Sequence, residues 1–244
     1  MNRFFLEKCK IADKAVMTGE DHRHLSRVLR LAAGDHVMLC DGENVDYLAK
    51  ITAVGKESTE LSIIESHPAG TEPDVRITLF QGLPKAGKLE LIIQKCVELG
   101  ISDIVPVAME RSVVKVSEKE FSSRHERYYR VSYEAAKQSR RGRIPEVHNI
   151  VRLAECDLSK YDMLLIAYED ETETTLKQAL KALSCTPRTV ALFIGPEGGF
   201  DLNEIAMLRD KGGVCVSLGR RILRTETAGM AAVAMILYEL EGRR

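Results

Sequence analysis

Leu192-Phe193-Ile194-Gly195-Pro196-Glu197-Gly198-Gly199-Phe200-Asp201 joins an apolar strand to a helix through a loop that holds three glycines. Glycine lets a backbone adopt positive φ and approach a ligand closely. Asp201 is expected to cap the helix that follows, over residues 201–211. Because ligands of open α/β sheets lie beyond the carboxyl ends of strands, this stretch predicts an α/β domain with a binding loop. A tight turn without a ligand is the alternative.

Strand and helix patterns alternate on both sides of this loop. The final helix is apolar almost all round, which predicts that it is buried. Gly100 is expected just past the end of the helix over 88–99. Buried apolar strands alternating with helices indicate an α/β fold with a parallel sheet. The expected strands are 75–80, 104–107, 163–167, 190–194 and 214–217, and the expected helices are 88–99, 121–140, 174–183, 201–211 and 225–240.

A change of pattern near residue 70 divides the chain. Two prolines and a glycine within residues 66–73 indicate a linker. Before it, strand-like runs at 36–40, 47–54 and 60–65 surround one helix. Thr18 to Asp21 resembles a capping box, and the helix that it opens is expected to bury Leu25, Val28 and Leu29. We therefore predict two domains, a small β module over residues 1–70 and the α/β domain over residues 74–244.

Composition limits the function classes. The 244 residues carry 35 basic and 36 acidic side chains, so indiscriminate binding of nucleic acid by overall charge is excluded. No stretch reaches the length of a membrane span, and the N-terminal residues show no signal-peptide pattern. The six cysteines are widely spaced, which is typical of a reducing cytoplasm rather than of a disulfide framework.

Two further loops have the same setting as the first. The segment from Leu218 to Thr227 follows a strand and places three arginines beside Gly219, where they could hold a phosphate or carboxylate. The segment from Leu79 to Glu90 also links a strand to a helix. Neither the dinucleotide fingerprint nor the P-loop pattern occurs. His22 and His24 lack the spacing of a metal pair on a helix, so no metal site is expected.

Basic residues cluster in two regions. Residues 111–143 hold ten Lys or Arg and four Glu, and the β module supplies Arg3, Arg23, Arg27 and Arg30. Such clusters can contact phosphates and give salt-dependent affinity for nucleic acid. A solvated helix face without a partner remains the alternative.

The loops and several short motifs together resemble the ribosomal-RNA small-subunit methyltransferase E family of the SPOUT superfamily. The matching segments include the three loops, Glu110-Arg111-Ser112, Gln138-Ser139-Arg140-Arg141 and the run His24 to Arg30. The resemblance covers nearly the whole chain. It implies a PUA-like β-barrel, a SPOUT-type α/β domain with a C-terminal trefoil knot, and a homodimer. It also implies S-adenosylmethionine as cofactor and methylation of uridine N3 in the decoding region of 16S rRNA, in the cytoplasm.

The resemblance assigns residues to roles. Arg224 would stabilise charge on the uracil, and Glu197 is a candidate base whose alternative role is to hold the loop by hydrogen bonds. Residues expected at the cofactor are Phe80, Gln81, Gly82, Ile194, Gly195, Pro196, Glu197, Gly198, Gly199, Leu218, Gly219, Ile222, Leu223, Arg224 and Thr225. Residues expected at the RNA are Arg3, Arg23, Arg27, Arg30, Arg111, Arg127, Gln138, Arg140 and Arg141.

Other functions stay open at this point. The chain could be a SPOUT methyltransferase that acts on another RNA or on a ribose 2′-OH. It could instead be an RNA-binding or assembly factor that has lost methyl transfer. An oxidoreductase that uses a dinucleotide is disfavoured, because its fingerprint is missing.

Overall fold

The computed structural model describes residues 1–85 and 87–241, and these form two compact units. The smaller unit contains Met1–Glu72 together with Ala136–Ile144. The larger contains Pro73–Ala135 and the chain from Pro145 onward. The sequence indicated the break near residue 70 but gave no sign that residues 136–144 return to the smaller unit. None of the described helices is long and apolar enough to cross a membrane.

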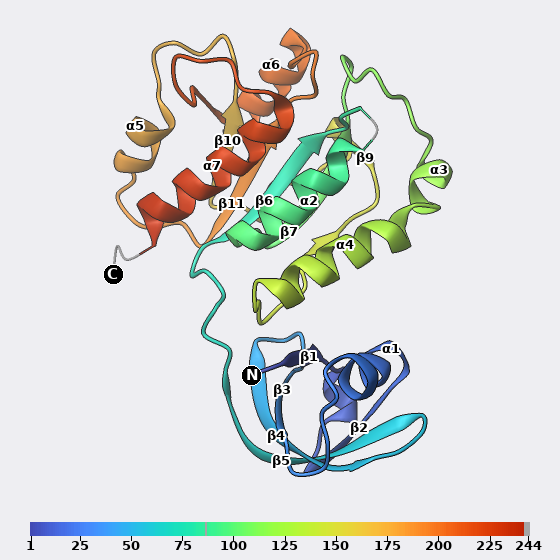
Figure 1. Ribbon diagram of the computed structural model, residues 1–244. Coiled ribbons are helices and arrows are strands. Elements are labelled where there is room, and N and C mark those ends of the chain that lie inside the picture. Colours follow the sequence, from blue (N-terminus) through green and yellow to red (C-terminus); the bar gives the residue numbers. More distant parts are fainter. Residues whose placement is uncertain (86, 242–244) are drawn as a thin grey trace. The chain divides into compact units, whose positions relative to one another are not determined.

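The smaller unit is built on one five-stranded sheet (Figure 1). Its spatial order is β1-β3-β4-β5-β2, with β1 parallel to β3 and the other pairs antiparallel. A core that includes Phe4, Leu39 and Ile51 fills one side of it. The strands are β1 (Arg3–Phe5), β2 (Lys14–Thr18), β3 (His36–Cys40), β4 (Val45–Val54) and β5 (Ser58–Pro68), with a short 3₁₀ turn, η1, at Lys8–Lys10.

The helical segment of the smaller unit differs from the expectation. It consists of α1 (Gly19–Arg23) followed by a π-helical turn, η2 (His24–Val28). Thr18 precedes α1 but its side chain makes no capping hydrogen bond, so the predicted capping box is wrong. Leu25 is fully buried, whereas Val28 is 67% exposed because the wider π turn rotates it away from the core.

The larger unit is a parallel sheet in the order β12-β10-β11-β6-β7-β8, and β9 also pairs with β7. Each pairing in it is parallel. The predicted strands are all present within a few residues. The bounds are β6 (Arg76–Gly82), β7 (Asp103–Ala108), β8 (Glu146–Val147), β9 (Val151–Arg152), β10 (Met163–Ala167), β11 (Thr189–Ile194) and β12 (Val214–Val216).

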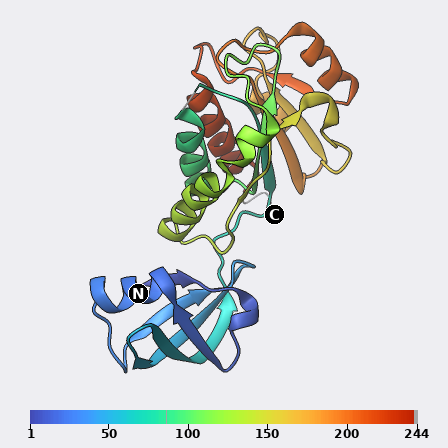
Figure 2. The ribbon, with the colours of Figure 1, turned by 90° about the vertical axis from the view of Figure 1, so that its right-hand side faces the viewer.

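Helices cover both faces of this sheet (Figure 2). α2 (Lys88–Leu99) and α7 (Thr225–Leu240) lie side by side on one face. α6 (Leu202–Asp210) packs on the opposite face, where Ile205 and Leu208 join a core that includes Phe80 and Phe193. Asp201 caps α6 by accepting from the Asn203 N–H, as predicted. Gly100 ends α2 with φ +106°, also as predicted.

Two predicted helices differ in detail. The expected helix over 121–140 is divided into α3 (Glu118–Ser122) and α4 (His125–Gln138). α7 has the predicted bounds but is not buried all round, because Met235 is 44% and Tyr238 is 88% exposed. The remaining elements are α5 (Leu176–Lys181) and the 3₁₀ turn η3 (Leu153–Glu155).

Candidate functional site

Four strands of the parallel sheet end beside one another at a single edge. The pairing register aligns Ile194 of β11 with Gln81 of β6 and with Ala167 of β10, and Ala167 with Val216 of β12. Parallel strands bring their carboxyl ends to the same edge, so the loops that follow these strands are neighbours. The loop after β11 and the segment between β12 and α7 were the two strongest predictions from the sequence.

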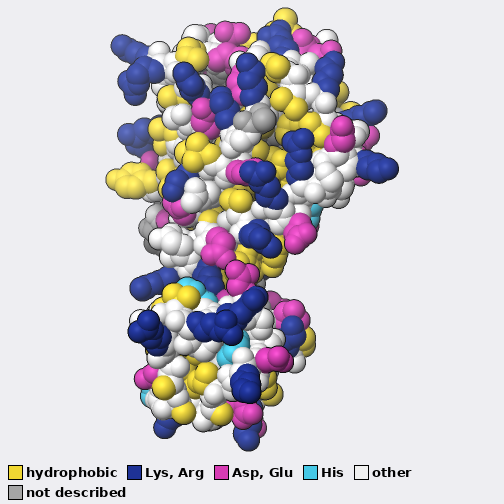
Figure 3. Space-filling view, turned by 45° about the vertical axis from the view of Figure 1, so that its right-hand side comes forward, with side chains coloured by type: hydrophobic (Ala, Val, Ile, Leu, Met, Phe, Trp, Pro, Cys, Tyr) yellow, Lys and Arg dark blue, Asp and Glu magenta, His cyan; other side chains and the backbone are white. Residues whose placement is uncertain are grey.

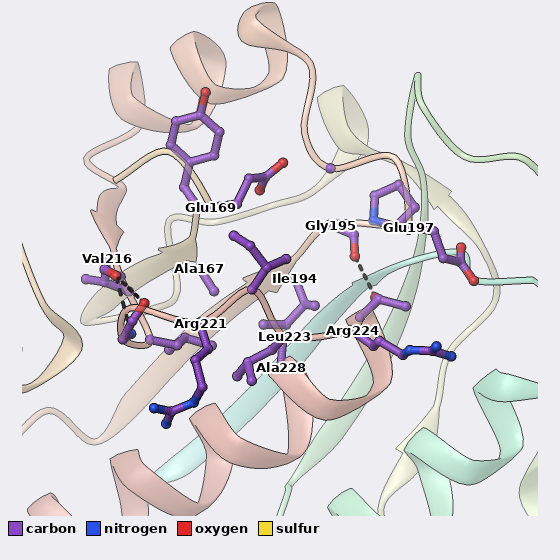
Figure 4. Close-up of a pocket in the computed structure, with 18 of the residues that line it drawn as sticks. Ala167, Glu169, Ile194, Gly195, Glu197, Val216, Arg221, Leu223, Arg224 and Ala228 are labelled. Atoms are coloured by element: carbon purple, nitrogen blue, oxygen red, sulfur yellow. Dashed lines mark hydrogen bonds between the residues drawn. The ribbon is translucent and has the colours of Figure 1, made fainter. Parts of the chain in front are cut away.

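A cavity of about 440 Å³ lies at this edge (Figure 4). Its volume falls in the range of small-molecule sites. Apolar side chains form part of its wall, and charged side chains line it as well. The lining residues are Lys88, Ala167, Tyr168, Glu169, Ile194, Gly195, Pro196, Glu197, Gly199, Val216, Ser217, Leu218, Gly219, Arg221, Ile222, Leu223, Arg224, Thr225 and Ala228.

Most residues that were expected at the cofactor line this cavity, but four do not. Phe80 points into the core on the other face of the sheet, where its ring stacks on Phe193 with centroids 4.6 Å apart. Gln81 is fully buried, and Gly82 packs against Pro196. Gly198 lies against the Arg111 backbone. The described part of the loop after β6 therefore supports the cavity from behind, and Lys88, at the start of α2, reaches it.

A buried chain of hydrogen bonds connects the three loops. Gln81 Nε2 donates to Thr225 Oγ1 at 2.9 Å. Thr225 Oγ1 in turn donates to the Gly195 carbonyl oxygen at 2.6 Å, the contact drawn as a dashed line at Gly195 in Figure 4. Thr225 is the first residue of α7, and Gly195 follows β11. The side chain of Thr225 thus fixes the direction of a carbonyl group in the cavity wall.

Lys88 joins two carboxylates at one end of the cavity. Its Nζ lies 3.1 Å from Glu197 Oε1 and 3.0 Å from Glu226 Oε2. Glu197 also accepts from the Lys85 N–H at 3.1 Å. Burial raises the pKa of Glu197, but the Lys85 N–H and the Lys88 ammonium outweigh it and the pKa lies below its ordinary value. Glu197 is therefore an ionised, anchored group, which favours loop anchoring over the role of general base.

Two cavity residues that the sequence analysis missed follow β10. Tyr168 and Glu169 lie in the lining because β10 pairs with both β11 and β12. The Glu169 carboxylate rests against Gly199, so a side chain at position 199 would collide with it. Gly199 also has φ +71°, a conformation that favours glycine. No glycine follows β10, which is why a search for glycine loops did not find this segment.

Arg3 and Arg141 of the smaller unit are not available to RNA in the manner predicted. Arg141 is 3% exposed and holds Glu72 through two nitrogens, at 2.9 and 2.6 Å. The Arg3 side chain pairs with Asp46 at 2.6 Å. Burial alone would raise the pKa of Glu72, but the contacts with Arg141 outweigh burial. The pKa of Glu72 is therefore below its ordinary value, and the carboxylate stays charged. These arginines are structural, and the Arg141 pair explains why residues 136–144 join this unit.

Other predicted RNA contacts are exposed. Arg23, Arg27 and Arg30 form no ion pair with any described residue of the chain. Figure 3 shows Lys and Arg side chains gathered with His side chains on the smaller unit. Gln138 and Arg140 are exposed as well.

The larger unit carries the two other predicted RNA contacts. Arg127 is exposed but pairs with Glu90 at 2.7 Å. Arg111 is exposed and lies 3.6 Å from Asp201. Both side chains could exchange these carboxylates for a phosphate.

One group of side chains among the described residues could hold a metal ion. It consists of Asp103, Glu146 and His148, at the edge of the sheet opposite the cavity. His148 contacts both carboxylates at 3.3 Å, and Arg76 also pairs with Asp103. The carboxylates of this group are thus already engaged by His148 and Arg76.

Comparisons of the sequence and of the structure with known proteins agree on one family. An RNA methyltransferase domain model matches residues 71–237, and an RNA methyltransferase PUA domain model matches residues 17–64. The chain is 34% identical to the ribosomal RNA small subunit methyltransferase E of Bacillus subtilis over 99% of this chain and 98% of the relative. It is 33% identical to the protein of the same name from Synechocystis, over 92% and 73% of the two chains.

A solved structure extends the similarity to the whole fold. The ribosomal RNA small subunit methyltransferase E of Neisseria gonorrhoeae, bound to S-adenosyl methionine, matches with a TM-score of 0.83 and 28% identity over 97% of this chain and 96% of that one. The chain therefore belongs to the RNA methyltransferase family that includes the ribosomal RNA small subunit methyltransferase E proteins.

Proposed function

We propose that this protein uses S-adenosylmethionine to methylate N3 of a uridine in 16S rRNA, in the decoding region of the small ribosomal subunit. The cavity at the carboxyl ends of four parallel strands is the observation that carries the proposal. The names of the relatives and the cofactor bound by the Neisseria gonorrhoeae structure support it. Because the proposed substrate is ribosomal RNA, we expect the protein to act in the cytoplasm.

The chemistry of the cavity wall fits this cofactor. Ile194, Leu223 and Ala228 offer an apolar surface on which an adenine can lie. Glu169 and Glu197 place carboxylates around the same space, and these suit the ribose hydroxyls and the positive charges of the cofactor. Backbone groups of the loops at 195–199 and 217–219 supply the remaining polar contacts.

We further propose that the larger unit carries a C-terminal trefoil knot and that the smaller unit is a PUA-like barrel. The segment between β12 and α7 supports the first point, because it lies against both the cavity and the start of α5. Ser217 bridges to Thr175, and Thr225 bonds to the Gly195 carbonyl. The PUA domain match over residues 17–64 supports the second.

The bound cofactor supplies an electrophilic methyl group on a sulfonium. The loops would hold it in one orientation toward the uracil, and such alignment can lower the activation barrier by about 7–11 kcal/mol. Loss of the N3 proton to water leaves negative charge on the uracil ring. The exposed guanidinium of Arg224, at the cavity and at the N-cap of α7, stabilises that charge. Glu197 holds the loop through Lys85 and Lys88.

The RNA around the target is held by exposed basic side chains on each unit. Arg23, Arg27, Arg30 and Arg140 serve this role on the smaller unit, and Arg111 and Arg127 on the larger. The uridine must leave any base stack to be methylated. Sequence-independent phosphate contacts therefore position the strand.

We propose that the protein acts as a homodimer through the outer faces of α2 and α7. Leu91, Leu99, Met235 and Tyr238 are large apolar side chains exposed on these adjacent helices. Positions 231, 235 and 238 share one face of α7 by helical spacing. Tyr238→Glu should convert the dimer to a monomer in light scattering, while Glu239→Gln on the same turn should not. A wild-type monomer would contradict this assembly.

The decisive experiment is nucleoside mass spectrometry of 16S rRNA from a strain that lacks the protein, before and after the protein and S-adenosylmethionine are added. N3-methyluridine should be absent at first and then restored. If a different modified nucleoside is missing and restored, such as a 2′-O-methylated one, the protein methylates another RNA or another atom. If no nucleoside changes, a role in RNA binding without methyl transfer replaces the proposal.

A further inference from the structure

The helices α2 and α6 end in the same pattern of backbone hydrogen bonds, with a glycine at its centre. After α2, the Gly100 N–H donates to the Val97 carbonyl oxygen at 3.1 Å, and the next N–H, that of Ile101, donates to the Cys96 carbonyl oxygen at 2.9 Å. This pair of bonds is the Schellman motif, whose central residue has positive φ and is usually glycine. Gly100 has φ +106°, and Gly212 has φ +87° at the same position after α6.

The helix α4 ends in the same motif, but an arginine stands at the glycine position. The Arg140 N–H donates to the Lys137 carbonyl oxygen at 3.3 Å, and the Arg141 N–H donates to the Ala136 carbonyl oxygen at 2.9 Å. Arg140 has φ +60°. A residue with a Cβ is disfavoured in this conformation, because the Cβ crowds the following carbonyl oxygen. Glycine would therefore make this end of α4 more stable than arginine does.

A second arginine with positive φ, Arg30, follows the π-helical turn η2. It has φ +55°, and the N–H of the next residue, Leu31, donates to the Leu25 carbonyl oxygen at 3.1 Å. Among the described residues, Asn44 is the other non-glycine residue with positive φ, and asparagine tolerates this conformation better than arginine does. Strained backbone conformations that a fold retains cluster at functional sites. A role of the arginine side chains would account for both positions.

The side chains of Arg30 and Arg140 can reach a partner in solution. Both residues are exposed, and neither forms an ion pair with another residue that the structure describes. Both belong to the smaller unit. The helical segments that they end lie against each other, because Lys137, in the last turn of α4, pairs with Asp21 of α1 at 2.8 Å.

This part of the smaller unit carries an excess of positive charge. Residues 19–30 and 136–144 together hold seven Lys or Arg and two carboxylates. A third carboxylate, that of Glu72, pairs with Arg141. Four positive charges remain when each of these carboxylates is matched with a cation. The excess suits a polyanion, and the proposed substrate is one.

We propose that Arg30 and Arg140 together bind the sugar–phosphate backbone of the RNA substrate, and that the smaller unit gives up stability to hold them in place. A guanidinium binds a phosphate best through two parallel hydrogen bonds, so the direction of the side chain is important. The positive φ sets the direction in which each side chain leaves the end of its helical segment. Attraction by charge alone would not need a strained backbone.

The test compares RNA affinity with thermal stability in the full chain. Arg30→Gly and Arg140→Gly should each raise the Tm by about 2–4 °C, because glycine adopts positive φ without strain. Each should also weaken binding of a 16S rRNA fragment that contains the decoding region, by about three- to tenfold in filter-binding assays. The slope of log affinity against log salt should fall by about 0.7–0.9 for each lost phosphate contact.

Two control variants isolate the effect of the backbone conformation. Gly212→Arg places an arginine at the same motif position after α6, where an added Cβ meets no atom within 4 Å. It should lower the Tm by about as much as Arg140→Gly raises it. Arg27→Gly removes an exposed arginine from within η2, at a position without positive φ. It should weaken RNA binding but lower the Tm, because glycine is unfavourable inside a helix.

The inference is overturned if either Arg30→Gly or Arg140→Gly binds the RNA with wild-type affinity and salt slope, or if either lowers the Tm. It rests on the proposed action on rRNA, and the two can fail separately. If the wild type does not methylate the RNA but both variants change as expected, the proposed methylation fails and the RNA contact stands. If the wild type methylates the RNA and the variants bind it normally, the RNA contact alone fails.

Discussion

Replacing Thr225 with valine removes one hydroxyl group from the place where the three loops meet. The Thr225 side chain is nearly isosteric with valine, and the residue is 6% exposed. Its Oγ1 donates to the Gly195 carbonyl at 2.6 Å and accepts from Gln81 Nε2 at 2.9 Å. The substitution therefore removes two hydrogen bonds without creating a large cavity.

The substitution affects the two hydrogen-bond partners of Thr225 differently. Gln81 Nε2 retains a second acceptor, the Gly82 carbonyl oxygen at 3.0 Å. The Gly195 carbonyl oxygen loses its hydroxyl donor in the buried wall. An orphaned buried polar group costs about 1–3 kcal/mol, and we expect a loss of about 2 kcal/mol here. For a unit of this size, that loss lowers the Tm by about 4–8 °C.

Calorimetric melting of Thr225→Val and Thr225→Ser checks this reasoning. Serine keeps the hydroxyl and should retain most of the stability, and it should also retain the affinity for S-adenosylmethionine. Valine should lower both, because the Gly195 carbonyl is then free to turn. The reasoning is refuted if Thr225→Val melts at the wild-type temperature. It is also refuted if Thr225→Ser loses as much stability as Thr225→Val, because the methyl group would then be the important feature.

Three other outcomes follow from particular contacts. Gly219→Val should abolish cofactor binding in calorimetry, because Gly219 has φ +123° and valine cannot adopt it without strain. Asp103 raises the pKa of His148, so the stability that His148 contributes is complete below its unfolded pKa of about 6.5 and is lost as the pH rises through the higher folded value. The stability difference between wild type and His148→Gln in urea titrations should therefore shrink from pH 6 upward, and a constant difference would contradict the ion pair. Arg27→Glu combined with Arg30→Glu should weaken RNA binding and flatten its salt dependence in filter-binding assays, with cofactor affinity unchanged.

The long apolar elements were predictable from the sequence because their patterns are local. α2 and α7 have the predicted bounds, and β10 matches residue for residue. Four strands, β1, β2, β8 and β9, were not predicted. β1 has only three residues and pairs in parallel with β3, more than thirty positions along the chain. A strand of that length shows no usable periodicity, and only its distant partner defines it.

The candidate site was predictable to the extent that it depends on strand ends. Glycine loops identified the segments after β11 and β12, but the lining after β10 contains Tyr168 and Glu169 without a glycine. Phe80 was expected at the cofactor from the resemblance, whereas alternation along β6 directs it into the core on the α6 side of the sheet. Arg141 was read as a phosphate ligand, since a sequence does not show the Glu72 carboxylate that neutralises it.

Glu197 and Arg224 have different parts in the proposed reaction. Glu197 accepts hydrogen bonds and an ion pair, and a carboxylate whose pKa is lowered is a weak base toward a uracil N–H. Arg224, two residues before Glu226, has an exposed guanidinium beside the same cavity. Removal of the N3 proton is therefore assisted mainly by stabilising the anion that it leaves. Arg224 and Thr225 are neighbours at the start of α7, so the position of that helix sets both the cation beside the cavity and the direction of the Gly195 carbonyl.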